Sequence, residues 1–353
     1  MSENLPKDVA TVGQLAEFDA VIDARAPGEF AEDRLPGAMS LPVLDDEERA
    51  RIGTLYKQVS AFEAKKLGAA LVSKNIARHI EQHLLDKPKS WRPLVYCWRG
   101  GQRSGAFTHI LREIGWDARR LRGGYKSWRQ HVIAQLTVLP RQIDFRVVAG
   151  ATGSGKSRLL EALSARGAQV LHLEELAAHK GSVLGNLPGQ PQPAQKGFES
   201  QLFAVLTGID PSRPVFVEAE SRKIGRLQLP DALLDAIRRA PGLRIEVPLQ
   251  ARVEFLLRDY DYATAAPDWL NERLDQLKGL HSNETLEHWR SLIARQDFPA
   301  LVEELLTRHY DPHYQRSQAS NYHSFEAATR YDTNGLDPAA LDNLAAEILS
   351  ASA

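Results

Sequence analysis

The hydrophobic and polar positions of this chain follow two patterns that alternate along its first third. Short continuous apolar runs are typical of strands buried in a parallel sheet, whereas apolar residues at helical spacing predict amphipathic helices. The runs are DAVIDA (residues 19–24) and PLVYCW (93–98), and the helical pattern covers residues 45–85 and 104–116. This order predicts a small α/β domain in which Cys97 lies between a strand and a helix.

The same alternation starts again after residue 142. The run DFRVVAG (144–150) leads through a glycine-rich turn into the helical segment KSRLLEALSARG (156–167), which predicts a second α/β unit. Further strands are expected at residues 168–173, 214–220 and 243–249, and helices are expected after residue 250.

Two segments have the composition of loops. Residues 130–142, which include Pro140, predict a linker, and the Pro- and Gly-rich residues 185–197 predict a mobile loop. We therefore expect two domains, residues 8–135 with a helical insertion and residues 136–353 with a helical C-terminal region. The chain has 353 residues, 43% of them hydrophobic, and is long enough to bury two cores.

Composition and charge exclude several classes. No run approaches the roughly 20 apolar residues that cross a bilayer, and no signal peptide is recognisable. We therefore expect a cytoplasmic protein that does not contact membranes. The single cysteine excludes an internal disulfide. The net charge of −1 does not favour nucleic acid, but residues 89–146 contain twelve Lys and Arg against three Asp and Glu. That excess of basic residues would attract a polyanion.

The segment from Cys97 to Ser104 forms the turn between the predicted strand and helix. Backbone N–H groups of such a turn and of a helix N-terminus bind anions, and the same field favours a thiolate. The predicted oxyanion-binding residues are Arg99, Gly100, Gly101, Gln102, Arg103 and Ser104. We therefore predict that Cys97 is a catalytic nucleophile, the alternative being a buried structural cysteine.

Residues 150–157 (GATGSGKS) match the P-loop pattern G-x-x-x-x-G-K-[ST] in the expected strand–turn–helix context. The predicted phosphate-binding residues are Gly150, Thr152, Gly153, Ser154, Gly155, Lys156 and Ser157. Candidate Mg²⁺ ligands are Ser157, Glu218 and Glu220, since the two glutamates face the same side at a strand end; alternatively, each is an ordinary strand-end charge. A P-loop can hold any diphosphate, so the motif does not establish ATP hydrolysis.

The eleven histidines show no metal-ligand spacing with the cysteine, so no transition-metal site is predicted. One of them, His323, lies outside the residues that the structure describes.

The residues around Cys97 resemble the rhodanese-like sulfurtransferases. Residues 23–25 (DAR) and 35–38 (LPGA) are similar to the first motif of that family, and residues 121–125 (LRGGY) are similar to its closing motif. Arg34 stands where many rhodaneses have a histidine, so the resemblance does not extend to an acid at that position.

The length of the cysteine loop favours a different family, the cysteine phosphatases. Five residues separate Cys97 from Arg103, which is the spacing of the cysteine phosphatases and fits a phosphate-sized group. The histidine that normally precedes the phosphatase cysteine is replaced by Tyr96, and a phosphatase would leave the second domain unexplained.

A rhodanese-like domain followed by a P-loop domain resembles the tRNA 2-selenouridine synthases over nearly the whole chain. Residues 53–58, 218–225 and 308–312 are also similar to that family. The resemblance implies that the sulfur of a wobble 2-thiouridine is replaced with selenium from selenophosphate, through an S-geranyl intermediate made from geranyl diphosphate. It further implies that Cys97 carries the selenium.

The implied co-substrates are selenophosphate and geranyl diphosphate, with no tightly bound cofactor and Mg²⁺ at the P-loop. The implied partners are the anticodon region of tRNA and the enzyme that supplies selenophosphate. We assign geranyl transfer to the P-loop, and expect Trp98, Tyr125 and Trp128 to stack on bases unless they belong to the core. Three other functions stay open: a persulfide sulfurtransferase to a carrier or tRNA, a cysteine phosphatase, and a non-catalytic nucleotide-switched tRNA-binding module.

Overall fold

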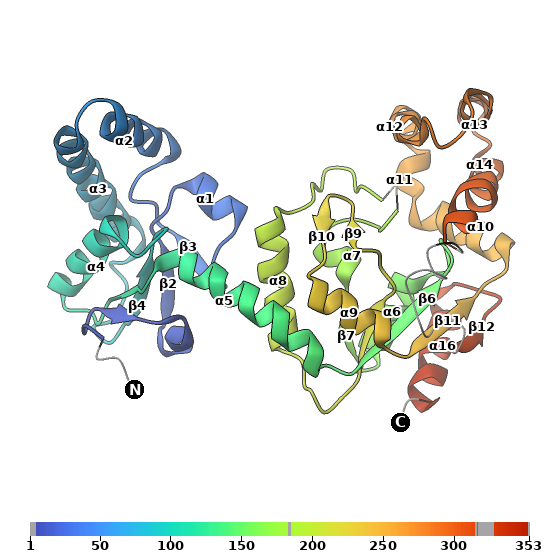
Figure 1. Cartoon of the computed structure of the whole chain (residues 1–353), viewed down its shortest axis with the longest axis horizontal. Coiled ribbons are helices and arrows are strands. Elements are labelled where there is room, and N and C mark those ends of the chain that lie inside the picture. Colours follow the sequence, from blue (N-terminus) through green and yellow to red (C-terminus); the bar gives the residue numbers. More distant parts are fainter. Residues whose placement is uncertain (1–4, 183–184, 315, 317–327, 352–353) are drawn as a thin grey trace. The chain divides into compact units, whose positions relative to one another are not determined.

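The computed structural model describes residues 5–182, 185–314, 316 and 328–351. The chain divides into two compact units, each with its own sheet (Figure 1). The first unit comprises Met1–Gln135 and Pro193–Ala204, and the second comprises Leu136–Gln192 and Val205–Ala353. Residues 193–204 therefore belong to the first unit, whereas the boundary expected from the sequence placed them in the second domain.

Among its described residues, the first unit has a five-stranded parallel sheet with the order β1-β5-β4-β2-β3. The strands are β1 (Val9–Ala10), β2 (Ala20–Asp23), β3 (Ala38–Ser40), β4 (Pro93–Tyr96) and β5 (Arg119–Leu121). The two strands predicted from apolar runs are thus confirmed as β2 and β4, which pair with each other. Cys97 follows directly after β4, at the carboxyl edge where α/β sheets bind ligands.

Helices at residues 46–58, 61–83 and 102–114 confirm the helical pattern predicted for 45–85 and 104–116, whereas the two short helices before them were not predicted. The helices of this unit are η1 (Val12–Glu17), α1 (Pro27–Glu32), α2 (Asp46–Gln58), α3 (Ala61–His83) and α4 (Gln102–Ile114). Phe107 and Leu111 of α4 are buried against Ile22 and Val95 of the sheet, which fixes the orientation of α4 relative to the cysteine. The helix ends where expected, with Gly115 in the left-handed region (φ 109°).

The linker expected at residues 130–142 is wrong. Helix α5 runs from Gly124 to Val138 and is followed directly by the 3₁₀ helix η2 (Leu139–Gln142). Trp128, Val132 and Leu136 are buried at helical spacing, and this burial stabilises the helix. Pro140 lies in the first turn of η2. An N–H in a first turn has no acceptor within the helix, so a proline, which lacks the N–H, costs no hydrogen bond there.

The described part of the second unit has a five-stranded parallel sheet with the order β12-β11-β6-β8-β7, and a short hairpin of β9 and β10. The strands are β6 (Phe145–Gly150), β7 (Gln169–Leu171), β8 (Val215–Glu218), β9 (Lys223–Ile224), β10 (Leu227–Gln228), β11 (Gly242–Glu246) and β12 (Thr329–Asp332). The four predicted strands of this unit are confirmed. Strand β12 was not predicted, because only Tyr331 of its four residues is buried.

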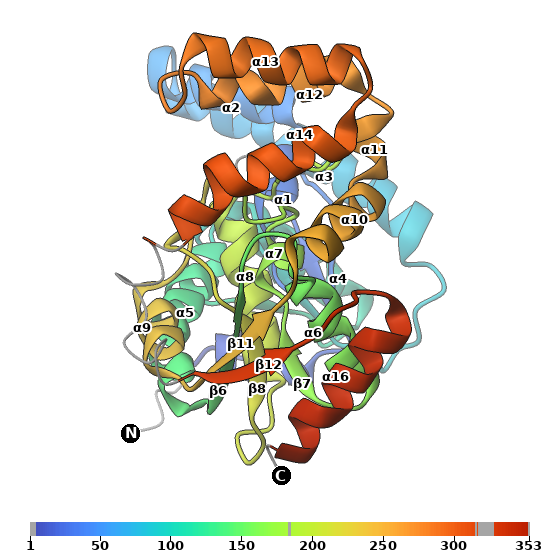
Figure 2. The same ribbon diagram turned by 90° about the vertical axis from the view of Figure 1, so that its right-hand side faces the viewer.

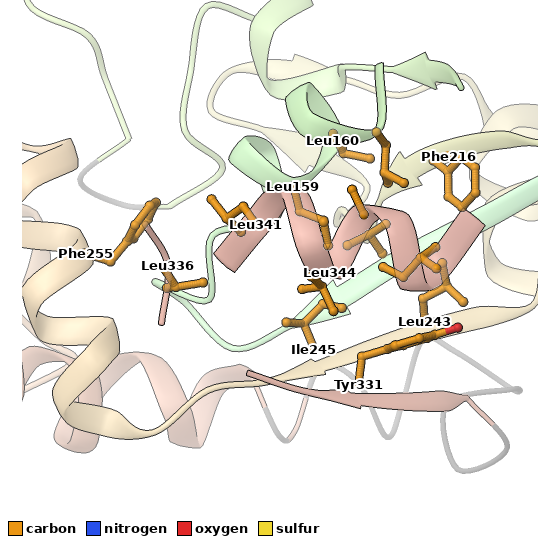
Figure 3. Close-up of a cluster of buried hydrophobic side chains, with 14 residues drawn as sticks. Leu159, Leu160, Phe216, Leu243, Ile245, Phe255, Tyr331, Leu336, Leu341 and Leu344 are labelled. Atoms are coloured by element: carbon orange, nitrogen blue, oxygen red, sulfur yellow. The ribbon is translucent and has the colours of Figure 1, made fainter. Parts of the chain in front are cut away.

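The core of this sheet is covered by α6 (Lys156–Ala165) and α16 (Pro338–Ala351), which pack on each other. In Figure 3, Leu159 and Leu160 of α6 and Leu341 and Leu344 of α16 lie in one cluster with side chains of the sheet. The remaining helices outside the C-terminal bundle are α7 (Leu173–Leu176), α8 (Gln195–Thr207) and α9 (Asp231–Arg239). Helix α8 begins inside the segment for which a mobile loop was expected.

The helical region predicted after residue 250 is confirmed and forms a small bundle in the second unit (Figure 2). Its elements are α10 (Leu249–Asp259), α11 (Asp261–Thr264), α12 (Pro267–Leu274), η3 (Asp275–Leu277), α13 (Asn283–Ala294), α14 (Phe298–Leu305) and the π-helical turn η4 (Leu306–Tyr310). The fully buried Trp289 lies in its core. Across the described ranges, no helix is long and apolar enough to span a bilayer.

Candidate active sites

Cys97 is the first residue of the turn between β4 and α4, and its side chain is buried, with 3% of it exposed. The Cys97 Sγ lies 3.2 Å from the Ser104 Oγ, and Ser104 in turn donates to the Gly101 carbonyl at 3.3 Å. Because Ser104 belongs to the first turn of α4, the thiol faces the N-terminus of a helix, where negative charge is stabilised.

The closing motif, residues 121–125, holds this turn in shape. The Tyr125 N–H donates to the Cys97 carbonyl at 2.8 Å. Gly100 and Gly124 both have positive φ (66° and 59°), and a Cβ on Gly124 would lie 2.2 Å from the Cys97 carbonyl oxygen. Glycine is therefore required at residue 124 by the close approach of two backbone segments.

The backbone N–H groups of the turn are available to a ligand. Within the described residues, the N–H groups of residues 98–101 donate to no acceptor. The N–H groups of Gln102 and Arg103 lie in the first turn of α4, where a helix offers no internal acceptors. Such a set of unpaired donors binds a tetrahedral oxyanion.

The two predicted arginines have different surroundings. Arg103 donates to the Glu29 carboxylate at 2.8 Å, and Glu29 also binds Arg49 at 3.1 Å. Burial raises the pKa of Glu29, but the hydrogen bond and charge of Arg103 outweigh it and lower the pKa below its usual value. Arg103 is thus already held by a carboxylate, whereas Arg99 is exposed and forms no ion pair in the described part of the chain. This arrangement disfavours the cysteine phosphatase, in which the loop arginine holds the phosphate.

The first motif forms a buried ion pair beneath the turn. Arg25, 1% exposed, binds Asp23 at 2.7 Å and donates to the Asp33 carbonyl at 2.6 Å. The Tyr96 hydroxyl donates to Asp23 at 2.5 Å, so the residue that replaces the phosphatase histidine has a structural role. A network satisfied in this way fixes the ends of β2 and β4. Arg34 is exposed and stacks on Phe30.

The basic segment at residues 89–146 is partly neutralised by acids outside it. Ion pairs of this kind among the described residues include Arg92 with Asp19, Arg103 with Glu29, Arg120 with Asp8, and Arg129 with Glu199 and Asp33. Tyr125 and Trp128 are 1% and 2% exposed, so the alternative that these two rings belong to the core is confirmed and they do not stack on bases. Trp98 is half-buried, and its ring centroid lies 5.3 Å from that of Tyr125.

In the second unit, residues 150–157 form the turn from β6 into α6. Gly153 and Gly155 have positive φ (81° and 74°), and within the described residues their N–H groups donate to no acceptor. Lys156 donates to the Gly150 carbonyl at 2.9 Å, which keeps its ammonium beside the turn. The structure therefore brings the predicted phosphate-binding residues together around one point.

Three carboxylates meet beside Ser157. Its hydroxyl donates to Glu174 at 2.8 Å, the Glu174 N–H donates to Glu218 at 2.8 Å, and Glu220 interacts with Glu174. Glu174 was missed from the sequence. The available signal was its place directly after the predicted strand 168–173, whose carboxyl end lies at the same sheet edge as the P-loop.

Burial keeps protons on two of these carboxylates. Burial raises the pKa of Glu218 to about 8, and burial together with the charges of Glu174 and Glu218 raises the pKa of Glu220 well above its usual value. The Glu218 Oε2 is buried without a hydrogen-bond partner among the described atoms. A cation would satisfy this oxygen, and the oxygen-only donor set suits Mg²⁺.

No three His, Cys, Asp or Glu side chains in the described ranges form a ready-made metal cage. Mg²⁺ does not require one, because it usually binds one or two carboxylates together with substrate phosphates and water. The residues present therefore fit Mg²⁺ bound along with a phosphate ligand.

Residues 308–312 hold the P-loop in place through Arg252. Arg252 of α10 donates to the Thr152 carbonyl at 2.9 Å and forms a bidentate ion pair with Asp311 at 2.6 and 3.1 Å. The Arg252 side chain is 8% exposed. The same segment contributes His309 and Tyr310 to the wall of the P-loop cavity, whose volume is ≈ 610 Å³. These contacts explain a segment for which the sequence alone offered no chemistry.

The fold and the two sites define a class of protein: a rhodanese-like domain with a nucleophile loop, followed by a P-loop domain. The rhodanese-like domain family matches residues 8–131, and the tRNA 2-selenouridine synthase AAA domain family matches residues 143–279. The predicted α/β fold class is thereby confirmed.

Relatives extend the match along the chain. A tRNA 2-selenouridine synthase of Alcanivorax borkumensis is 33% identical over 326 residues, covering 83% of this chain and 88% of that protein. One of Nitrosomonas europaea is 40% identical over 248 residues, covering 69% of this chain and 64% of that protein, so this match spans less than two thirds of the relative. A solved rhodanese-related protein from Thermoplasma volcanium is 16% identical with a TM-score of 0.23, covering 35% of this chain and 91% of that chain. The chain belongs to the tRNA 2-selenouridine synthase family.

Proposed function

We propose that this chain is a transferase that replaces the sulfur of wobble 2-thiouridine in tRNA with selenium from selenophosphate, through S-geranyl-2-thiouridine formed from geranyl diphosphate. The observation that carries the proposal is the buried Cys97 thiol in a turn whose backbone N–H groups at residues 98–101 are unpaired among the described residues, in a chain that also has a P-loop. The relatives, which are tRNA 2-selenouridine synthases, support the same assignment.

Geranyl transfer is assigned to the second unit. The diphosphate binds the amides of residues 150–157 and Lys156, while the thiouridine sulfur attacks C1 of the geranyl group. The sulfur–C1 bond forms, the C1–oxygen bond breaks, and the diphosphate leaves with the electron pair, while the N3 proton of the base passes to solvent. Mg²⁺ held by Ser157, Glu174 and Glu218 would neutralise the charge on the leaving diphosphate.

Selenium exchange is assigned to the first unit. Selenophosphate is a tetrahedral oxyanion, which suits the N–H groups of residues 98–103 and the exposed Arg99. Attack of the Cys97 thiolate on phosphorus breaks the phosphorus–selenium bond and releases hydrogen selenide. The selenide displaces geranylthiolate at C2 of the base, and water hydrolyses the sulfur–phosphorus bond to give phosphate.

The resemblance implies instead that Cys97 carries the selenium as a selanyl group. Forming that group requires a different reaction and different products. Attack of the thiolate on selenium would leave phosphorus as phosphite, and a further thiol would be needed to reduce the sulfur–selenium bond. The chain has only one cysteine and supplies no such thiol. We therefore favour attack on phosphorus, which keeps selenium at the selenide level throughout.

The anticodon region of tRNA is proposed to dock around the cysteine turn. Arg99, Arg122 and Lys126 are exposed there, and the half-buried Trp98 is the ring available for stacking on a base. Electrostatic docking of this kind weakens steeply with salt, so an affinity for tRNA that does not change with salt would contradict it. We propose that the reaction takes place in the cytoplasm. The selenophosphate is supplied by the enzyme that makes it.

The test is mass spectrometry of nucleosides from 2-thiouridine-containing tRNA after incubation with geranyl diphosphate and selenophosphate. The wild-type chain is expected to form 2-selenouridine, Cys97→Ala is expected to stop at the S-geranyl nucleoside, and Lys156→Ala is expected to leave 2-thiouridine unchanged. Normal geranylation by Lys156→Ala would refute the assignment to the P-loop. Phosphorus NMR is expected to show phosphate, and phosphite would instead identify the selanyl route.

A further inference from the structure

An apolar cavity of ≈ 80 Å³ lies inside the helical bundle of the second unit. Its walls come from α10, α11, α12, α14 and η4, with Thr152 of the P-loop and Ser182 at its edge. The residues that dominate the walls are Leu257, Leu270, Phe298, Leu301, Val302 and Leu305. A cavity of this size can hold a buried apolar group.

This cavity adjoins the P-loop cavity. Both are lined by Thr152, Ser182, Leu256, Tyr260 and Tyr310. The contact is close, because a Cβ on Gly153 would lie 2.9 Å from the Leu256 Cδ1. Phosphate-binding amides therefore lie on one side of these shared residues, and a hydrocarbon-lined cavity lies on the other.

The side chains that line the apolar cavity decide which class of ligand group it can hold. Of the residues that line only the apolar cavity, those with polar side-chain groups are Thr264 and Trp269, and the Thr264 hydroxyl already donates to the Asp261 carbonyl at 2.8 Å. A nucleotide base placed there would leave several polar atoms without partners, which is costly. A branched hydrocarbon chain has no such atoms and gains from leaving water.

Aromatic rings stand where the two cavities meet. Tyr260 and Tyr310 line both, and the Lys180 ammonium already lies 4.0 Å from the centroid of the Tyr260 ring. That contact shows that the ring accepts a cation on its face. Positive charge that develops on an allylic carbon as its bond to the diphosphate breaks would arise at this junction.

We propose that the apolar cavity binds the hydrocarbon chain of an isoprenoid diphosphate whose diphosphate lies at the P-loop, and that Trp269 and Leu270 of α12 limit the length of that chain. This assignment rests on the proposed function. It adds the location of the chain-binding subsite and the residues that select chain length.

The first test fills the cavity and measures binding by calorimetry with Mg²⁺ and without tRNA. Leu301→Trp and Val302→Trp place an indole in the cavity, and Glu303→Trp adds the same ring to an exposed position of α14 as the matched control. Both cavity variants are expected to bind geranyl diphosphate at least tenfold more weakly than wild type and inorganic diphosphate within twofold of it. The control is expected to match wild type for both ligands.

Two results separate this inference from the proposed function. Cavity variants that still bind inorganic diphosphate but also bind geranyl diphosphate as tightly as wild type would overturn the subsite, even if wild type geranylates tRNA. Failure of wild type to geranylate tRNA would instead refute the proposed function.

A second test uses the wild-type chain, so it does not depend on the folding of the cavity variants. Affinity is expected to rise at least tenfold from dimethylallyl to geranyl diphosphate and not to rise further for farnesyl diphosphate. Trp269→Ala is expected to improve binding of farnesyl relative to geranyl diphosphate at least fivefold. Equal affinity of wild type for inorganic, dimethylallyl and geranyl diphosphate would overturn the inference.

Discussion

The Tyr125 N–H donates to the Cys97 carbonyl at 2.8 Å, which ties the closing motif of the first unit to the nucleophile. The contact requires glycine at residue 124, where a Cβ would lie 2.2 Å from the same carbonyl oxygen. Gly124→Ala is therefore expected to lower the free energy of unfolding by at least about 2 kcal/mol and to abolish selenation. Urea unfolding and the nucleoside assay check both. Gly53→Ala, in an open position of α2, is the control; it is expected to leave selenation unchanged and to raise stability by at most about 1 kcal/mol, since alanine favours a helix.

Arg99 and Arg103 of the cysteine turn are expected to have different roles. Arg99 is exposed without an ion pair among the described residues, so Arg99→Ala is expected to weaken selenophosphate use about tenfold without changing stability. Arg103 is bound to Glu29, so Arg103→Ala is expected to destabilise the first unit by about 1 kcal/mol. Comparing KM and thermal unfolding distinguishes the two roles. A normal KM for Arg99→Ala would rule it out as a ligand of the oxyanion.

Removing Asp311 is expected to disturb the P-loop from a distance. Asp311→Ala leaves the Arg252 guanidinium, 8% exposed, without its carboxylate, and Arg252 holds the Thr152 carbonyl. We expect a loss of about 2–3 kcal/mol in stability and roughly tenfold weaker diphosphate binding, because a buried charge loses its partner. The exposed pair of Arg308 with Glu304 is the control, and Arg308→Ala is expected to cost less than about 1 kcal/mol.

Glu218 is expected to make both stability and Mg²⁺ binding depend on pH. Its folded pKa of about 8 lies above the ordinary value of 4.5, so the folded chain keeps a proton that the unfolded chain has lost. Stability without Mg²⁺ therefore falls as pH rises from about 4.5 to about 8. Glu218→Gln is expected to flatten this dependence and to raise stability at pH 8 by roughly 2 kcal/mol.

Mg²⁺ must displace the same proton, so its affinity is expected to rise with pH up to about 8 in wild type. Titration calorimetry in buffers of different ionisation enthalpy measures the released proton. A pH-independent Mg²⁺ affinity in wild type would show that Glu218 does not bind the ion.

Local patterns predicted both candidate sites because each is a short strand–turn–helix segment whose chemistry lies in consecutive residues. The apolar runs and the glycines at residues 97–104 and 150–157 were sufficient to place them. Glu174 directly follows a predicted strand, but that position alone does not bring it near Ser157, because the distance between them depends on the order of strands in the sheet.

The same limit explains the open alternatives and the errors. Whether Tyr125 and Trp128 face bases or the core depends on burial that α5 acquires only in the folded unit. The charge of the basic segment was overestimated because acids such as Asp8 and Glu199 pair with it from outside. Strand β12 has only one buried residue and exists because β11 offers it a parallel partner.

Neither unit is contiguous in the chain, and this has a consequence for the order in which they can form during synthesis. The first unit includes residues 193–204, where the Ser200 hydroxyl donates to Asp33 at 3.0 Å, so it is incomplete when Gln135 leaves the ribosome. The second unit waits longer, because β12 and α16 complete its sheet and core from the last residues. Nascent chains that end before residue 329 would therefore expose the edge of β11 and the apolar face of α6, and chains of that length are the ones that should need a chaperone.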